Sequence, residues 1–184
     1  MQETFVTEKI SVNRISISLL SIITISILTY LGASLKIYLP FTPVPVTFQT
    51  YFVLTAAALT QYYISMSGQI LYIIAALIGI PVFANGLTGI PALLHPTSGY
   101  ILGFIIASFV VGKLLQKSNY SIYKLFIAMI LGNCIIYLFG VFRLALICGI
   151  KNSILLGVIP FIYGDILKII LATLTVKTLR GKIK

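Results

Sequence analysis

Two charged side chains interrupt the last apolar stretch of the chain. Asp165 and Lys168 are the only charged residues between positions 154 and 176. A charge at the centre of a membrane helix costs about 2.5–3.5 kcal/mol on insertion scales, so such a residue usually has a function. Because positions three apart lie on the same face of a helix, the spacing predicts a carboxylate beside an ammonium at membrane depth. Such a pair either contacts a ligand or only neutralises itself.

The composition indicates a chain embedded in a membrane. Of its 184 residues, 59% are hydrophobic and 9% are charged, and the mean hydropathy is +1.11. Soluble domains carry about 25% charged residues. We therefore interpret residues 1–184 as a single integral membrane domain. Residues 1–14 are expected to be a cytoplasmic N-terminal segment before a retained first span, and residues 179–184 a cytoplasmic basic tail.

The apolar stretches are spaced as membrane helices. A spanning helix needs about 20 apolar residues, with a range of about 17–25. The sequence predicts an all-α membrane protein with six transmembrane helices, at residues 15–35, 47–63, 68–80, 99–115, 122–147 and 154–178. The third of these is short unless it begins near residue 64.

The basic residues predict the orientation, because Lys and Arg are enriched in cytoplasmic loops. With the N-terminus inside, the outer loops hold only Lys36, Arg143 and Lys151. The cytoplasmic segments hold nine basic residues: Lys9, Arg14, Lys113, Lys117, Lys124, Lys177, Arg180, Lys182 and Lys184. Both termini are therefore expected in the cytoplasm of a multi-pass cell-membrane protein. The net charge of +10 follows this pattern and does not indicate nucleic-acid binding.

Two connections on the predicted outer side are apolar but irregular. Residues 39–50 contain three prolines, and residues 79–91 are rich in Gly and Pro. Proline excludes a regular helix, and irregular backbone at membrane depth is covered by protein or lines a cavity. We expect these connections to form two lids above Asp165 and Lys168.

The sequence lacks the motifs of common enzyme classes. It has no phosphate-binding Gly-x-x-x-x-Gly-Lys-Ser/Thr loop and no zinc-protease or Cys-x-x-Cys motif. Three acidic residues in all leave little for a Mg²⁺ site or a two-carboxylate mechanism. Cys134 and Cys148 fit no metal motif, and His95 stands alone. The expectation is a protein that is not an enzyme and holds no metal or cofactor.

Four strings occur in an order that is typical of one family. They are PFTPVPVTFQT at 40–50, GIPVFANG at 79–86, HPTSGYILGF at 95–104 and PFIYGDILK at 160–168. Together they resemble the substrate-binding subunits of biotin transporters, the BioY family. These subunits are the S components of energy-coupling-factor (ECF) transporters.

The resemblance implies a six-helix S-component fold that binds biotin near the outer face without chemistry on the ligand. By the family pattern, Asn85, Asp165 and Lys168 would contact biotin. The first loop, with Thr47 and Gln49, would close over it. The implied partners are a transmembrane coupling subunit and two ABC-type ATPase subunits.

The chemistry of biotin is compatible with these residues. Asp165 can accept from a ureido N–H, Asn85 can donate and accept, and Lys168 can donate to the carbonyl or the carboxylate. Aromatic side chains are expected as apolar walls: Phe83, Tyr100, Tyr137 and Tyr163. The orientation of the ligand stays open at this point.

Two departures from the family pattern concern the coupling surface more than the pocket. Arg143 stands where an apolar residue is usual, and Ser, Ile and Thr replace an alanine-spaced face in the first helix.

The alternatives to a biotin-binding subunit are an S component for a different vitamin or, from another class, a membrane enzyme or a structural scaffold.

Overall fold

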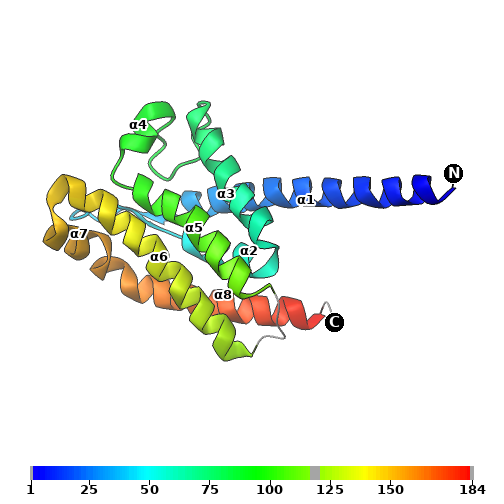
Figure 1. The fold of residues 1–184 in the computed structure, drawn as a ribbon. Coiled ribbons are helices and arrows are strands. Elements are labelled where there is room, and N and C mark those ends of the chain that lie inside the picture. The colour runs from blue at the N-terminus through cyan, green and yellow to red at the C-terminus, as the bar shows by residue number, and fades with distance from the viewer. Residues whose placement is uncertain (1, 117–120, 183–184) are drawn as a thin grey trace.

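The computed structural model describes residues 2–116 and 121–182, so Lys117, Lys184 and part of the predicted basic tail lie outside the described residues. Figure 1 shows the helices side by side, both termini at one end of the bundle, and the first half of α1 extending past the others. In chain order the elements are α1 (Gln2–Ser34), β1 (Lys36–Ile37), β2 (Val46–Thr47), α2 (Gln49–Leu59), α3 (Tyr62–Leu77), α4 (Gly89–Leu94), α5 (Ser98–Leu114), α6 (Ile122–Cys148), α7 (Ile150–Gly157), the 3₁₀ turn η1 (Ile159–Phe161) and α8 (Ile162–Lys182).

Each of the six predicted spans overlaps at least one helix. The helices α5 and α6 match the predicted spans at 99–115 and 122–147 to within one residue at each end. The helix α3 begins at Tyr62, six residues before the predicted start of the third span, because its first turns include polar side chains that are buried against the bundle. Burial of Ser65 and Gln69 in this helix is not visible in a hydropathy profile.

Two of the predicted spans contain a break in the helix. The second span is interrupted: β2 takes residue 47, and extended backbone at Thr60 and Gln61 ends α2 after 11 residues. The sixth span is divided by η1, where Pro160 has no N–H to continue a helix from the preceding turn. The first helix begins at Gln2, so it includes residues 2–14, which precede the predicted first span.

Within the described part of the chain, three helical segments are long and apolar enough to cross a membrane: Asn13–Ser34, Ile122–Cys148 and Ile150–Arg180. The helices α2, α3 and α5 are apolar but shorter, with 11, 16 and 17 residues. They pack against one another and against α1, α6 and α8.

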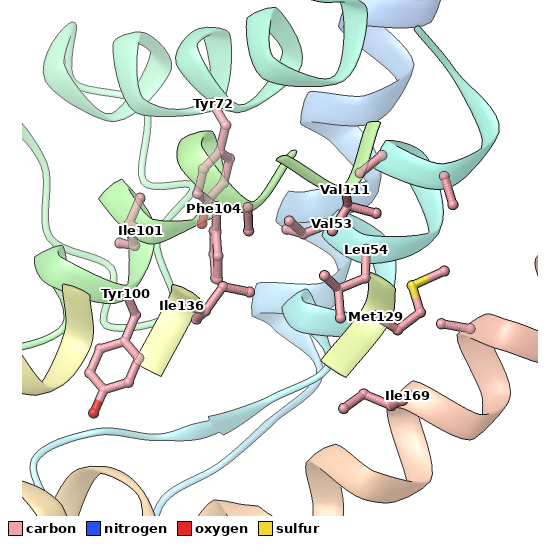
Figure 2. Packing of buried hydrophobic residues seen from close by; sticks show 14 of the residues in the cluster. Val53, Leu54, Tyr72, Tyr100, Ile101, Phe104, Val111, Met129, Ile136 and Ile169 are labelled. Atoms are coloured by element: carbon pink, nitrogen blue, oxygen red, sulfur yellow. The ribbon is translucent and has the colours of Figure 1, made fainter. Parts of the chain in front are cut away.

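The core forms where α5 packs against α2, α3 and α6. Figure 2 shows Tyr72 of α3, Phe104 of α5 and Ile136 of α6 within this core, and all three are buried. A methyl group at Gly103 would come within 2.9 Å of Ile136 Cα, and one at Gly112 within 2.7 Å of Tyr62 Cα. The small residues of α5 therefore allow close helix packing inside the bundle.

The first irregular connection is a β-hairpin. Strand β1 pairs antiparallel with β2, with Lys36 opposite Thr47. The backbone N–H of Phe48 donates to Gly32 O at 3.0 Å, which satisfies a carbonyl at the end of α1. The second connection, residues 79–91, is irregular up to the short helix α4.

Candidate ligand-binding site

The Asp165–Lys168 pair lies inside the bundle near the start of α8. Asp165 is 4% exposed and Lys168 is 7% exposed. Lys168 Nζ donates to Asp165 Oδ1 at 2.6 Å, so the contact predicted from their spacing is present. Desolvation of each charge costs several kcal/mol, which a close ion pair with further hydrogen bonds offsets.

Three other side chains donate to the same carboxylate. Tyr137 of α6 donates to Asp165 Oδ2 at 2.5 Å. Thr50 of α2 donates to Oδ1 and Asn133 of α6 donates to Oδ2, each at 3.5 Å. Those two bonds are at the upper limit of hydrogen-bond length. The carboxylate thus has two strong donors and two weak ones, and a ligand N–H can replace a weak donor at small cost.

The break before α8 places Asp165 in the first turn of that helix. Pro160 within η1 suits a helix start because the first N–H groups of a helix have no partner in it. The positive end of the helix dipole there stabilises a carboxylate. The 3₁₀ turn therefore supplies both the position of Asp165 and part of the potential that favours its charge.

A cavity of about 60 Å³ lies beside the pair. It is formed by the first loop, the second connection, α2, α5, α6, η1 and α8. Its lining residues are Val44, Pro45, Thr47, Gln49, Thr50, Ala84, Thr97, Tyr100, Ile101, Phe104, Ile136, Tyr137, Phe161, Asp165 and Lys168. Figure 2 shows Tyr100, Ile101, Phe104 and Ile136 in this part of the core. The wall is mostly apolar, with a few polar groups that converge on one side.

A chain of hydrogen bonds fixes the Gln49 wall. Thr47 Oγ1 donates to Gln49 Oε1 at 3.2 Å, and Gln49 Nε2 donates to the Tyr72 hydroxyl at 2.9 Å. The Tyr72 hydroxyl donates in turn to Val82 O at 2.9 Å. The end of the hairpin, α3 and the second connection are thereby joined through one side-chain amide.

The hairpin is fastened to its surroundings at two places. Lys36 Nζ and the Tyr38 hydroxyl both donate to Ala84 O, at 2.5 and 2.8 Å. Thr42 Oγ1 donates to Leu156 O of α7 at 2.6 Å. Because Ala84 itself lines the cavity, the two connections meet at the cavity wall.

Six of the nine residues predicted for the site line this cavity: Thr47, Gln49, Tyr100, Tyr137, Asp165 and Lys168. Phe83 is buried one layer behind, with its ring 5.2 Å from that of Tyr72. Tyr163 is 83% exposed and lies away from the cavity. Asn85 follows Ala84; its Oδ1 accepts from Leu87 N at 3.0 Å, and its buried Nδ2 has no partner among the described residues.

Sequence analysis missed Thr50 and Asn133, which both contact Asp165. A signal for Asn133 was present, because it is the one side-chain amide in the apolar run 122–147, and polar residues inside membrane helices usually face the bundle interior. Thr50 offered no comparable signal, since hydroxyl residues are common in such helices and often bond only their own backbone.

Two further residues outside the cavity have structural contacts. Thr97 N donates to His95 Nδ1 at 3.3 Å, and partial burial lowers the pKa of His95, which keeps the ring neutral and able to accept. Arg143 of α6 donates to Leu94 O at the end of α4. Among the described residues no three His, Cys, Asp or Glu side chains gather as a metal site would require.

Known sequences and structures provide an independent comparison. The sequence profile of the BioY family matches residues 5–184. A probable biotin transporter BioY of Pyrococcus horikoshii is 36% identical over 154 residues, which cover 84% of this chain and 90% of that protein. The biotin transporter BioY of Thermotoga maritima is 35% identical over 148 residues, 80% of this chain and 86% of that protein.

A solved structure has the same fold. The crystal structure of the S-component for biotin from an ECF-type ABC transporter superposes with a TM-score of 0.81 at 26% sequence identity. The match covers 92% of this chain and 93% of that one. The S-component fold expected from the sequence motifs is therefore confirmed.

Proposed function

The chain belongs to the BioY family of biotin transporters, and from this premise we propose that it binds biotin in the cavity beside Asp165 and Lys168. Like its relatives, it is a transport protein and not an enzyme, and it has the fold of an S component. The observation that carries the binding site is the buried Asp165–Lys168 pair, which lines a cavity covered by the first-loop hairpin.

The proposed contacts follow from hydrogen-bonding capacity. Asp165 accepts from a ureido N–H of biotin in place of its weak donors Thr50 and Asn133. Lys168 has three N–H donors, of which Asp165 uses one. Asn85 contributes its unpartnered Nδ2. Tyr100 and Tyr137 bring aromatic surface to the apolar ring of biotin.

The first loop acts as the cover of this site. Thr47 and Gln49 line the cavity from the end of the hairpin. The cavity of about 60 Å³ is below the roughly 300–1,000 Å³ that is usual for small-molecule sites. Biotin therefore enters only when the hairpin or the second connection moves outward.

Transport requires partners. We propose that the chain forms one membrane domain in the cell membrane, with both termini in the cytoplasm, and works with a transmembrane coupling subunit and two ABC-type ATPase subunits. The ECF-type ABC transporter from which the similar solved structure comes supports this assembly. We propose that the coupling surface lies on the cytoplasmic half of the first three helices, away from the lids.

Binding is tested with labelled biotin and the purified protein in detergent. We expect saturable, high-affinity binding that unlabelled biotin displaces and that other vitamins, such as thiamine or riboflavin, do not. Displacement by another vitamin instead of biotin would show an S component of different specificity. No binding of any of them to folded protein would refute the proposed function.

Transport is tested in liposomes. The chain alone should bind biotin without accumulating it, and accumulation should require the coupling subunit, both ATPases and ATP. A bulky residue at Ser21 or Ser26 should lower uptake and leave binding intact if the coupling surface is placed correctly. Accumulation by the chain alone that stops when an ion gradient collapses would show a secondary transporter.

A further inference from the structure

A groove of about 340 Å³ lies between the start of α6 and the second half of α8. Figure 1 shows the first turns of α6 and the last turns of α8 at the end of the bundle where both termini lie. The residues that line the groove are Ile122, Tyr123, Phe126, Ile170, Thr173 and Leu174. None of them lines the cavity beside Asp165, so the groove is a separate feature of the surface.

The walls of the groove are apolar and open to the surroundings of the bundle. Tyr123, Phe126, Ile170 and Leu174 are exposed. Thr173 is buried, and its hydroxyl donates to Ile169 O at 2.8 Å, so its one hydroxyl hydrogen is already used. An occupant that lies along this groove therefore makes mainly apolar contacts.

A lysine continues the face of α8 that lines the groove. Lys177 follows Leu174 by three positions and Thr173 by four, so it lies one turn further along the same face. Its side chain is exposed. The methylene stem of a lysine can lie along apolar surface while its ammonium reaches the membrane surface. In the proposed topology this end of α8 is the cytoplasmic one.

No carboxylate of α6 or α8 lies near enough to neutralise Lys177. Asp165 is the only acidic residue after Glu8 and lies 12 positions before Lys177, about 18 Å along the helix. Asp165 is also paired with Lys168. The N-terminus of α6, which Ser121 caps, adds the positive end of a helix dipole to this region. The groove thus combines apolar walls with a positive end.

We propose that this groove binds an anionic phospholipid, with an acyl chain along the apolar walls and the phosphate group beside Lys177. Basic pockets between membrane helices on the cytoplasmic side bind anionic headgroups. An apolar helix of a partner protein would contact the same walls but would leave Lys177 without an anion. The proposed coupling surface lies elsewhere, because α1 packs on α2 and α3 while the groove lies between α6 and α8. This inference goes beyond the proposed function and does not depend on which vitamin the cavity binds.

The test compares two lipids with the same acyl chains, the anionic phosphatidylglycerol and the zwitterionic phosphatidylcholine. Each is added to the purified protein in detergent, and native mass spectrometry counts the bound lipids. We expect the unaltered protein to retain phosphatidylglycerol in preference. Lys177→Gln should lower the affinity for phosphatidylglycerol about fivefold, the effect of one basic residue near an anionic membrane surface, and leave that for phosphatidylcholine unchanged. Lys177→Arg should keep most of the preference.

Lys124 provides a matched control at the same end of the bundle. It is exposed, but it is two positions from both Ile122 and Phe126, about 200° around α6, and it does not line the groove. Lys124→Gln should therefore leave the binding of phosphatidylglycerol unchanged. A loss equal to that of Lys177→Gln would show a general attraction to the basic end and overturn the site. Equal retention of the two lipids by the unaltered protein would also overturn it.

A second pair of variants tests the acyl-chain part of the site. Ile170→Trp fills the groove and should weaken both lipids by a similar factor, whereas Leu171→Trp, at an exposed position of α8 outside the groove, should weaken neither. Both positions are exposed, so helicity measured by circular dichroism should be unchanged. Unaltered lipid binding by Ile170→Trp would overturn the proposal. If that variant instead fails to co-purify with the coupling subunit, the groove is a contact for that subunit.

Discussion

Between α1 and α3, Gln69 Nε2 donates to Thr29 Oγ1 at 3.1 Å, and Thr29 Oγ1 in turn donates to Ile25 O at 2.9 Å. Both side chains are completely buried, and this cluster is held by two continuous helices. The cluster around Asp165 is also buried, but two of its hydrogen bonds are 3.5 Å long, and Asn133 Oδ1 has no partner among the described residues.

The difference distinguishes a polar contact that stabilises the fold from the cluster that we propose as the binding site. A buried polar group costs free energy unless it is hydrogen-bonded, and the Thr29–Gln69 contact meets that requirement within the chain. The Asp165 cluster retains bonding capacity beside a cavity. Its covering segments are a hairpin and an irregular connection, whereas the Thr29–Gln69 contact lies between helices.

The largest effect is expected from breaking the ion pair. Asp165→Asn and Lys168→Ala should each lower biotin affinity at least tenfold, because each removes one ligand contact and leaves the other charge buried without its partner. Isothermal titration or filter binding measures the affinity, and yield and helicity report folding. If well-folded variants bind biotin as before, the pair serves only the structure.

The double variant Asp165→Leu/Lys168→Leu sharpens this test. Removing both buried charges is often neutral for stability, so thermal stability should recover relative to the single variants while biotin affinity stays low. Recovery of both stability and affinity would show that the pair does not contact the ligand.

A smaller effect is expected from the hydroxyl of Tyr137. Tyr137→Phe removes the 2.5 Å bond to Asp165 and keeps the aromatic wall. The lost bond contributes about 1 kcal/mol, so biotin affinity should fall about fivefold. Titration measures this, with Tyr163→Phe as the matched control, since Tyr163 is 83% exposed and lies away from the cavity. Equal effects of the two variants would contradict the placement.

The covering segments should respond to the ligand, unlike the helices around Gln69. Amide hydrogen exchange at residues 40–50 and 81–91 should slow when biotin is added, and residues 62–77 should not change. Tyr38→Phe, which removes one bond to Ala84 O, should speed exchange of these segments in the free protein and lower affinity by no more than about twofold. Equal protection with and without biotin would refute a gating role.

The smallest effect on binding is expected at Gln69. Gln69→Leu keeps the volume, and Thr29 still donates to Ile25 O. The free energy of unfolding should fall by about 1 kcal/mol, measured by thermal unfolding in detergent, with unchanged biotin affinity. A marked loss of affinity would mean that the two clusters are coupled, which would break the distinction drawn between them.

Some of the site could be predicted from particular residues. Asp165 and Lys168 are three apart, so any helix brings them together, and prolines at 40, 43 and 45 exclude a helix in the first loop. The position of Tyr163 was also open to sequence reasoning: it lies two residues before Asp165, about 200° around the helix, and therefore faces away. The break at Pro160 could have been anticipated for the same reason as the first loop.

The sequence alone determined the class and family of this protein, because hydropathy, the Asp165–Lys168 spacing and the loop motifs are local properties. Only the tertiary structure decided which side chains from other helices meet the carboxylate, since Thr50, Asn133 and Tyr137 are separated from Asp165 by 28 to 115 positions. It also decided that the first-loop hairpin and the second connection meet at the wall of the cavity, where Lys36 and Tyr38 donate to Ala84 O. Such contacts depend on how helices pack and where the hairpin lies, and no local pattern encodes them.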